Sequence, residues 1–353
     1  MGKWPFNPGP FIVLLMIQWL THSSDALRGF AMKDPHERTF PVYLPPHYDP
    51  KRQEPYPVVF FLAGFSGKGA TYISDVSAFG TALPDRLDQA IEAGRLRPCI
   101  AAFPDGTSRL GCSQYVNSPV LGNYMDYICD ELPAFIDDRF NTHRSRDFRA
   151  VTGHSSGGFG ALVIGMLRPD AFGFLLSSAG DSFYEVSLLP NSTRALIEIE
   201  KAGSVEAFVK CFLESPNPGA LPPAQFDTIL TLAMAPCYAP NPNRPPLFGD
   251  LFFDLKTGQV IPEIWEKYLA WDPLRMVDKY VANLKTLHYI RLEAGLADEH
   301  GLQFGHRQLA AKLRQHAIGC ELEEYPGAHG GHHWRFENRL VRIVDKMYAR
   351  HRS

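Results

Sequence analysis

The chain has 353 residues, of which 45% are hydrophobic and 21% charged, and its formal net charge is -3. This composition is that of a globular protein with a sizeable core, and the length suits one large α/β domain or two small ones. It excludes a low-complexity chain, and the near-neutral charge argues against a nucleic-acid or polyanion partner.

The first predicted element is an apolar stretch at residues 11–20. It is too short to cross a bilayer, which takes roughly 20 residues. Three prolines before it and Gln18 within it favour a buried first strand. The alternative is a signal peptide over residues 1–26 with a poor cleavage site, which would make the protein secreted.

Strands and helices then alternate along the chain. Strands are predicted at residues 38–44, 58–64, 99–106, 148–152, 172–180, 287–295 and 320–325. Helices are predicted at residues 80–94, 122–140, 159–169, 306–317 and 339–350. The stretch 58–64 is apolar throughout, which is typical of a strand covered on both faces. The alternation predicts an α/β fold with a mostly parallel central sheet and helices on both faces.

This alternation stops between residues 183 and 266, where proline clusters separate short helical patches. Such a composition suits an insertion that covers one face of the sheet. We therefore expect a core made of residues 1–182 and 267–353, with residues 183–266 inserted as a cap.

Residues 153–157 read GHSSG and match G-x-S-x-G, with a predicted strand before them and a helix after them. This context is typical of a nucleophile elbow, in which the serine sits on a strained turn above the sheet. Glycines two residues before and after the serine let strand and helix pass closely, because a Cβ there would clash. The spacing selects Ser155, since Ser156 has His154 two positions before it. A phosphate-binding loop is disfavoured because the Gly-Lys-Ser/Thr ending is missing.

A nucleophilic serine needs a base to take its proton, and the base needs a carboxylate to orient it. In this architecture the chain order is Ser, acid, His. Asp298 lies one short turn after the strand 287–295, and His329 is the first histidine after the strand 320–325. All three side chains are therefore expected at the carboxyl edge of one sheet, where ligands bind in open α/β folds.

Other residues compete for these two roles. Glu299 adjoins Asp298, and further histidines lie at positions 300, 332 and 333, with His332 the runner-up to His329. This group of side chains also suggests a metal site, but two glycines disrupt the helix that a His-x-x-His ligand pair usually needs. The six cysteines show no CxxC spacing, which favours buried, reduced thiols over a zinc site or disulfides. We therefore expect no metal and no cofactor.

Acyl transfer also requires N–H donors directed at the developing oxyanion. We expect them from the backbone of Ser156, at the start of a helix, and of Phe65, in the loop after the strand 58–64. Residues 113–118 (SQYVNS) either line the substrate pocket through Tyr115 and Asn117 or only shape a loop.

With these residues placed, the chain resembles the "putative esterase" family of α/β-hydrolases, which includes esterase D (S-formylglutathione hydrolase), enterochelin esterase-like proteins and feruloyl esterase domains. The similar stretches are residues 34–49, 56–67, 103–106, 113–118, 122–137, 153–162, 298–302 and 323–329. The resemblance implies an α/β-hydrolase fold, with the family's nucleophile at Ser155, its acid at Asp298 and its base at His329. It also favours a strand at 11–20, and hence a cytoplasmic protein. The oxyanion loop reads LAGF, where relatives often have a histidine before the glycine. The cap at 183–266 is longer than in compact members, so no specific substrate is implied.

The sequence thus predicts a serine carboxylesterase that hydrolyses a small-molecule ester through an acyl-enzyme on Ser155. Three alternatives stay open. They are an acyltransferase using the same three residues, a thioester hydrolase of the S-formylglutathione type, and a non-catalytic binding protein on the same scaffold. No nucleic-acid partner and no membrane span are expected. Whether the protein forms a homo-oligomer stays open.

Overall fold

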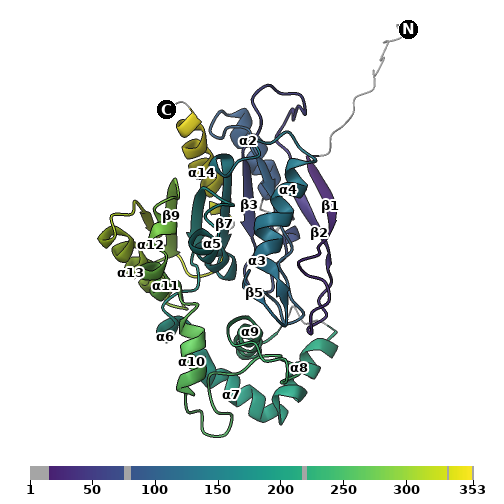
Figure 1. The fold of residues 1–353 in the computed structure, drawn as a ribbon, viewed down its shortest axis with the longest axis vertical. Coiled ribbons are helices and arrows are strands. Elements are labelled where there is room, and N and C mark those ends of the chain that lie inside the picture. Colours follow the sequence, from purple (N-terminus) through teal and green to yellow (C-terminus); the bar gives the residue numbers. More distant parts are fainter. Residues whose placement is uncertain (1–15, 75–80, 217–220, 332–333, 352–353) are drawn as a thin grey trace, which may run out of the picture.

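A computed structural model of the chain describes residues 16–74, 81–216, 221–331 and 334–351. An eight-stranded sheet crosses it in the order β1-β2-β4-β3-β7-β8-β9-β10 (Figure 1). These strands are β1 (Ile17–Ser23), β2 (Glu37–Tyr43), β3 (Val58–Leu62), β4 (Ile100–Ala102), β7 (Arg149–His154), β8 (Phe174–Ser178), β9 (Tyr289–Gly295) and β10 (Glu321–Tyr325). The pairs β1–β2 and β2–β4 are antiparallel, and the pairs from β4 through β10 are parallel. The predicted mostly parallel sheet is confirmed.

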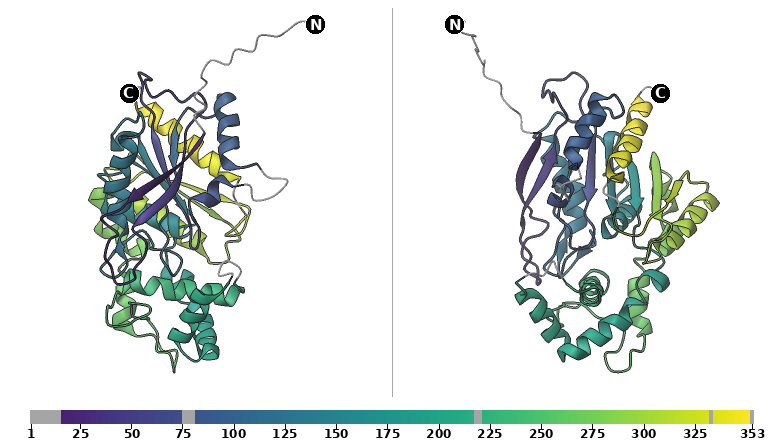
Figure 2. Two further views of the ribbon diagram at one scale, coloured as in Figure 1. Left: turned by 90° about the vertical axis from the view of Figure 1, so that its right-hand side faces the viewer. Right: turned by 180° about the vertical axis from the view of Figure 1, so that it is seen from behind.

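Helices cover both faces of this sheet (Figure 2). One face carries α2 (Leu83–Glu92) and α14 (Arg335–His351), and the other carries α4 (Leu132–Asp137), α5 (Ser156–Leu167) and α13 (Leu302–Gln315). Successive side chains of a strand point to opposite faces, so that β3 sends alternate residues into two separate apolar cores. A strand buried on both faces reads as a continuous apolar run, which explains the pattern at residues 58–64.

The predicted helix at residues 122–140 is wrong in its details. Its first residues pair in a small hairpin of β5 (Asn117–Ser118) with β6 (Gly122–Asn123). The rest divides into α3 (Tyr124–Asp126), a π-helical turn (Tyr127–Glu131) and α4. Pro133 stands at the start of α4 and lacks the N–H that a continuous α-helix would use there, so the hydrogen-bond ladder is interrupted at this point.

The segment between β8 and α11 (Pro273–Lys279) includes the expected cap. It forms a helical layer beyond one end of the sheet, rather than over one of its faces (Figure 1). The helices of this layer are α6 (Tyr184–Ser187), α7 (Asn191–Ala202), α8 (Val205–Glu214), α9 (Pro223–Tyr238) and α10 (Pro262–Leu269). α9 contacts the core, because the Ser118 hydroxyl donates to the Pro236 carbonyl at 2.6 Å and the rings of Phe65 and Phe226 pack edge to face. The helix α10 runs across the boundary expected at residue 266.

The remaining helices complete the core. They are α1 (Ala70–Ile73), the 3₁₀ turn Arg146–Phe148, α11 (Pro273–Lys279) and α12 (Val281–Leu284). Part of the predicted first strand, residues 11–15, lies outside the described residues, and β1 begins at Ile17. Across the described ranges, no helix is both long and apolar enough to cross a membrane. All six cysteines are free thiols.

Candidate active site

Ser155 lies between β7 and α5 with backbone angles φ 57° and ψ -125°, in the left-handed region that L-residues rarely adopt. The two glycines of the motif explain how strand and helix fit around it. A Cβ on Gly153 would lie 2.4 Å from the backbone of Gly157, and a Cβ on Gly157 would lie 2.0 Å from the carbonyl oxygen of Leu62. Only glycine fits at either position, and this close packing turns the serine away from the sheet.

The structure brings three of the predicted side chains into one line of hydrogen bonds. Ser155 Oγ lies 3.0 Å from His329 Nε2, and His329 Nδ1 lies 2.9 Å from Asp298 Oδ2. The Asp298 side chain has no exposed surface, and that of His329 is 16% exposed. A buried carboxylate on one ring nitrogen leaves the other nitrogen free to accept a proton from the serine.

The competing residues take other positions. The Glu299 carboxylate accepts the backbone N–H of His329 at 2.9 Å, and so holds the loop rather than the imidazole. The His300 ring packs edge to face on the His329 ring, with centroids 4.7 Å apart. His332 and His333 lie outside the described residues. Within the ranges that the structure describes, no three His, Cys, Asp or Glu side chains gather as metal ligands would.

The hydrogen bond between His329 and Asp298 favours the charged form of both side chains. Burial alone would lower the pKa of His329, but the hydrogen bond and charge of Asp298 outweigh it and raise that pKa above 6.5. Burial would raise the pKa of Asp298, yet the hydrogen bond and charge of His329 bring it below 3.8. Burial and the His329 charge lower the pKa of His300, so that this second ring stays neutral.

The segments that carry the two expected N–H donors both lie next to Ser155. Ser156 is the first residue of α5, and the first N–H groups of a helix have no acceptor within the helix. The loop that carries Phe65 packs directly on the elbow, since a Cβ on Gly64 would lie 3.1 Å from the His154 carbonyl oxygen. A negative charge forming here would also face the positive end of the α5 dipole.

Residues 33–347 match the sequence profile of a family described as "Putative esterase". The chain belongs to this family. It is accordingly a serine hydrolase that acts on carboxylic esters.

Solved structures of similar fold include a ferulic acid esterase, which is 15% identical, with 94% of this chain and 98% of the other covered and a TM-score of 0.60. An S-formylglutathione hydrolase from Agrobacterium tumefaciens is 20% identical, with 95% of each chain covered and a TM-score of 0.54. One from Staphylococcus aureus is 16% identical, with 94% and 98% covered and a TM-score of 0.55. These similarities confirm the predicted α/β-hydrolase fold.

A small cavity of about 30 Å³ opens beside Ser155 in this esterase. Its other walls come from the loop after β8, from the cap and from the segment after Asp298, with lining residues Asp181, Tyr184, Ser187, Leu188, Asn191, Leu230, Met234, His300 and Leu302. This is the space that a substrate group next to the serine would occupy.

Tyr115 and Asn117 are not among the lining residues of this cavity, and of the two possibilities left open for them, their contacts favour the shaping of a loop. The Tyr115 side chain is buried, with its ring against Gly106 and Gly160, and its hydroxyl donates to the Ala63 carbonyl at 2.7 Å. The Asn117 side chain accepts the N–H groups of residues 125 and 126, at the start of α3. Both residues shape loops, and Tyr115 holds Ala63, two residues before Phe65.

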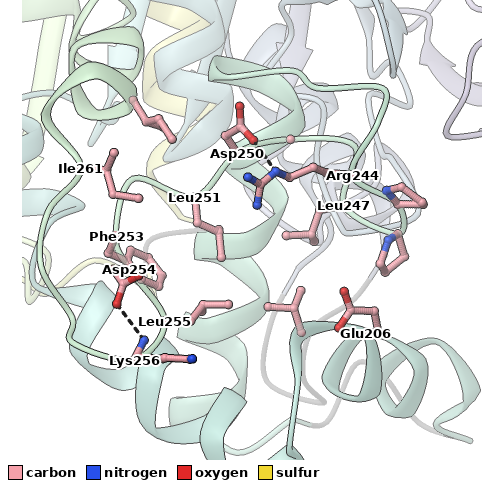
Figure 3. A pocket seen from close by; sticks show the side chains of 15 residues that line it. Glu206, Arg244, Leu247, Asp250, Leu251, Phe253, Asp254, Leu255, Lys256 and Ile261 are labelled. Carbon is pink, nitrogen blue, oxygen red and sulfur yellow. Dashed lines mark hydrogen bonds and ion pairs between the residues drawn. The ribbon is translucent and has the colours of Figure 1, made fainter.

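A larger cavity of about 460 Å³ lies within the cap and does not include Ser155 or His329 among its lining residues. Figure 3 shows its apolar side chains, among them Leu251 and Phe253, next to an ion pair between Arg244 and Asp250 at 3.0 Å. It is therefore separate from the site described above.

Sequence reasoning missed Asp181, which lies three residues after the end of β8. The same rule that selected Asp298, a polar residue just past a strand at the carboxyl edge, would have selected it.

Proposed function

We propose that Ser155 is the nucleophile of this esterase, that His329 is its general base and that Asp298 orients and balances the imidazole. The single observation that supports these roles is the continuous hydrogen-bond line of 3.0 and 2.9 Å from hydroxyl to carboxylate. Both lengths are within the reach that proton transfer needs.

In the first half of the reaction, Ser155 Oγ attacks the ester carbonyl while His329 Nε2 takes its proton. The carbonyl oxygen becomes an oxyanion, which the N–H groups of Phe65 and Ser156 stabilise. His329 then gives its proton to the leaving alcohol as the ester C–O bond breaks, which leaves an acyl group on the serine. Water repeats these steps and releases the acid.

The small volume beside Ser155 supports a short substrate group at this position. A cavity of about 30 Å³ holds only a few heavy atoms, since a cavity must offer roughly 10–15 Å³ to hold one water molecule. A feruloyl group is far larger than this. The short acyl group of an S-formyl thioester fits, and a thioester is attacked by the same chemistry.

The experiment is the hydrolysis of 4-nitrophenyl acetate by the wild-type enzyme and by Ser155→Ala. Removal of the nucleophile should lower kcat by roughly 10⁴-fold or more and abolish labelling by a fluorophosphonate probe. Ser192→Ala is the control, because the Ser192 hydroxyl donates to the carbonyl of Leu189 in the cap and Ser192 does not line the cavity beside Ser155. Full activity in Ser155→Ala would contradict the proposal.

Two further expectations stay predictions. Cell fractionation tests the cytoplasmic location, and light scattering tests the homo-oligomer.

Product analysis with an added alcohol separates the hydrolase from an acyltransferase, since the two differ in whether water or the alcohol reaches the acyl-enzyme.

A further inference from the structure

A carboxylate that takes no part in the proposed mechanism lines the cavity beside the nucleophile. Asp181 is half-buried there. Within the described residues its hydrogen-bond partner is the Ser156 hydroxyl, which donates across a long 3.5 Å. The same hydroxyl also accepts the Gln114 amide at 3.0 Å. Much of the hydrogen-bonding capacity of the Asp181 carboxylate is therefore available to a molecule in the cavity.

The loop that carries Asp181 is strained and firmly held. Ala179 and Phe183 both have left-handed backbone angles, with φ of 43° and 58°. The Asp272 carboxylate accepts the N–H groups of Phe183 and Tyr184, each at 3.0 Å. Strain of this kind persists only where surrounding contacts enforce it, and it concentrates at functional sites.

A buried histidine adds to this support. His306 has no exposed surface, and its Nε2 accepts the N–H of Gly180 at 3.0 Å. Burial lowers the pKa of His306 to about 4, so the ring stays neutral and acts as an acceptor. The residue before Asp181 is thus fixed by a contact that has no role in acyl transfer.

Among the described residues, no lysine or arginine lines the cavity, and its one lining histidine is His300, whose pKa is lowered. The other walls of the cavity are mostly apolar, and the Ser187 hydroxyl is directed to the backbone carbonyl of Ser182 at 3.0 Å. Burial raises the pKa of Asp181 to about 6, with the His329 charge acting against this and the Asp298 charge adding to it. The group is therefore ionised in mildly alkaline buffer.

A negative charge in this position acts on both charges that form in the reaction. It favours the charged form of His329, and it opposes formation of the oxyanion unless something pairs with it. The tetrahedral intermediate on Ser155 carries an oxyanion close to the Ser156 N–H, and a nearby carboxylate repels that charge in a site of low dielectric. A substrate hydroxyl or ammonium group bonded to Asp181 removes the repulsion and adds a charge-assisted hydrogen bond.

We propose that Asp181 is a specificity residue, which selects esters that carry a hydroxyl or ammonium group close to the ester carbonyl or its alkoxy oxygen. The inference rests on the proposed function, in that Ser155 is the reacting group of the same cavity. The small volume limits the donor-bearing group to a few heavy atoms.

The test compares esters of matched size that differ in one donor. On the acyl side, phenyl glycolate and phenyl glycinate are compared with phenyl propionate. On the alcohol side, 2-hydroxyethyl acetate is compared with propyl acetate. A hydroxyl near the carbonyl also raises intrinsic reactivity, so the measured quantity is the kcat/KM ratio of donor to non-donor ester in the wild type, divided by the same ratio in Asp181→Leu.

This quotient should be about 10-fold to 100-fold on one of the two sides, as expected for a hydrogen bond to a charged group. Asp181→Leu should hydrolyse propionate or propyl acetate at least as fast as the wild type, and Asp181→Asn should lose the preference for the ammonium ester. Glu185→Gln, which removes a carboxylate paired with Arg275 outside the cavity, should leave the ratios unchanged.

A quotient near one on both sides would overturn the inference. So would a parallel loss on all esters with a shifted pH profile, because Asp181 would then act through His329. Fluorophosphonate labelling of each variant reports whether the fold and Ser155 are intact. The proposed function stands if the wild type labels and hydrolyses acetate esters, whichever ester ratio is found.

Discussion

Replacing Gly157 by alanine tests whether the close packing at the elbow fixes the site. The added Cβ would lie 2.0 Å from the carbonyl oxygen of Leu62 and 2.8 Å from that of Ala63, whereas such contacts in proteins are essentially never below 3.0 Å. The backbone must therefore move by about 1 Å, and no side-chain rotation can relieve the contact. Leu62 is the last residue of β3, which pairs with β4 on one side and β7 on the other.

Two effects should follow from this displacement. Forced overpacking of a closely packed core should lower the free energy of unfolding by about 2–3 kcal/mol. The moved segment also leads directly into the loop that carries Phe65, whose N–H we propose as an oxyanion donor, and a shift of about 1 Å in a reacting geometry costs about 100-fold in rate. We therefore expect kcat/KM for 4-nitrophenyl acetate to fall by roughly that factor.

Urea unfolding and steady-state hydrolysis measure both quantities on the same preparation. Gly319→Ala is the matched control, because a Cβ on Gly319 meets no atom within 4 Å. This control should stay within about 0.5 kcal/mol of the wild type and keep full activity. If Gly157→Ala behaved like Gly319→Ala in both assays, close packing would not be what positions the serine.

Three other outcomes are expected. Asp298→Asn should lower kcat by roughly 10⁴-fold with little change in KM, because an amide that donates to Nδ1 holds the imidazole in the wrong tautomer. kcat/KM should fall about tenfold per unit as pH drops through a midpoint above 6.5, because the bonding and charge of Asp298 raise the pKa of His329 and only its neutral ring can take the serine proton. In native protein a thiol reagent should modify exposed Cys211 quickly and buried Cys99 and Cys112 slowly, because burial raises the pKa of the latter two to about 12; Cys211→Ser should remove the fast phase.

The elements that the sequence predicted well are those whose contacts require a particular pattern of neighbouring residues. The glycine spacing around Ser155 follows from contacts between adjacent segments of backbone, and an apolar run such as residues 58–64 follows from burial on both faces. The chain order of serine, acid and histidine predicted that they meet, because parallel strands end at a common edge. Their proximity is observed, and their roles stay a proposal.

Other features depend on tertiary contacts that leave no local pattern. The sequence left open whether Tyr115 lines the pocket or shapes a loop, and its ring fills space left open by Gly106 and Gly160, far apart in the chain. The segment at residues 122–140 has helical spacing throughout, yet it begins in the β5–β6 hairpin and contains a π-helical turn at Tyr127–Glu131, directly before Pro133. Neither fact can be derived from periodicity.

A buried ionic network connects the backbone of the nucleophile, through β8 and α14, to the strand before the acid. The Ser155 N–H donates to the carbonyl of Ser178, the last residue of β8, at 2.9 Å. The Ser178 hydroxyl accepts a hydrogen bond from Arg339 of α14 at 2.5 Å, and Arg339 is paired with Glu293 of β9, which leads to Asp298. Arg339 and Glu293 are each 1% exposed.

Burying two charges adds little net stability, since desolvation offsets their attraction. What such a network does provide is fixed geometry, because moving either strand would break a fully desolvated pair. The distance between nucleophile and acid is thus set by the core and the C-terminal helix, and not by the cap. The cap and the Asp181 loop are therefore free to determine which ester binds without displacing the groups that would cleave it.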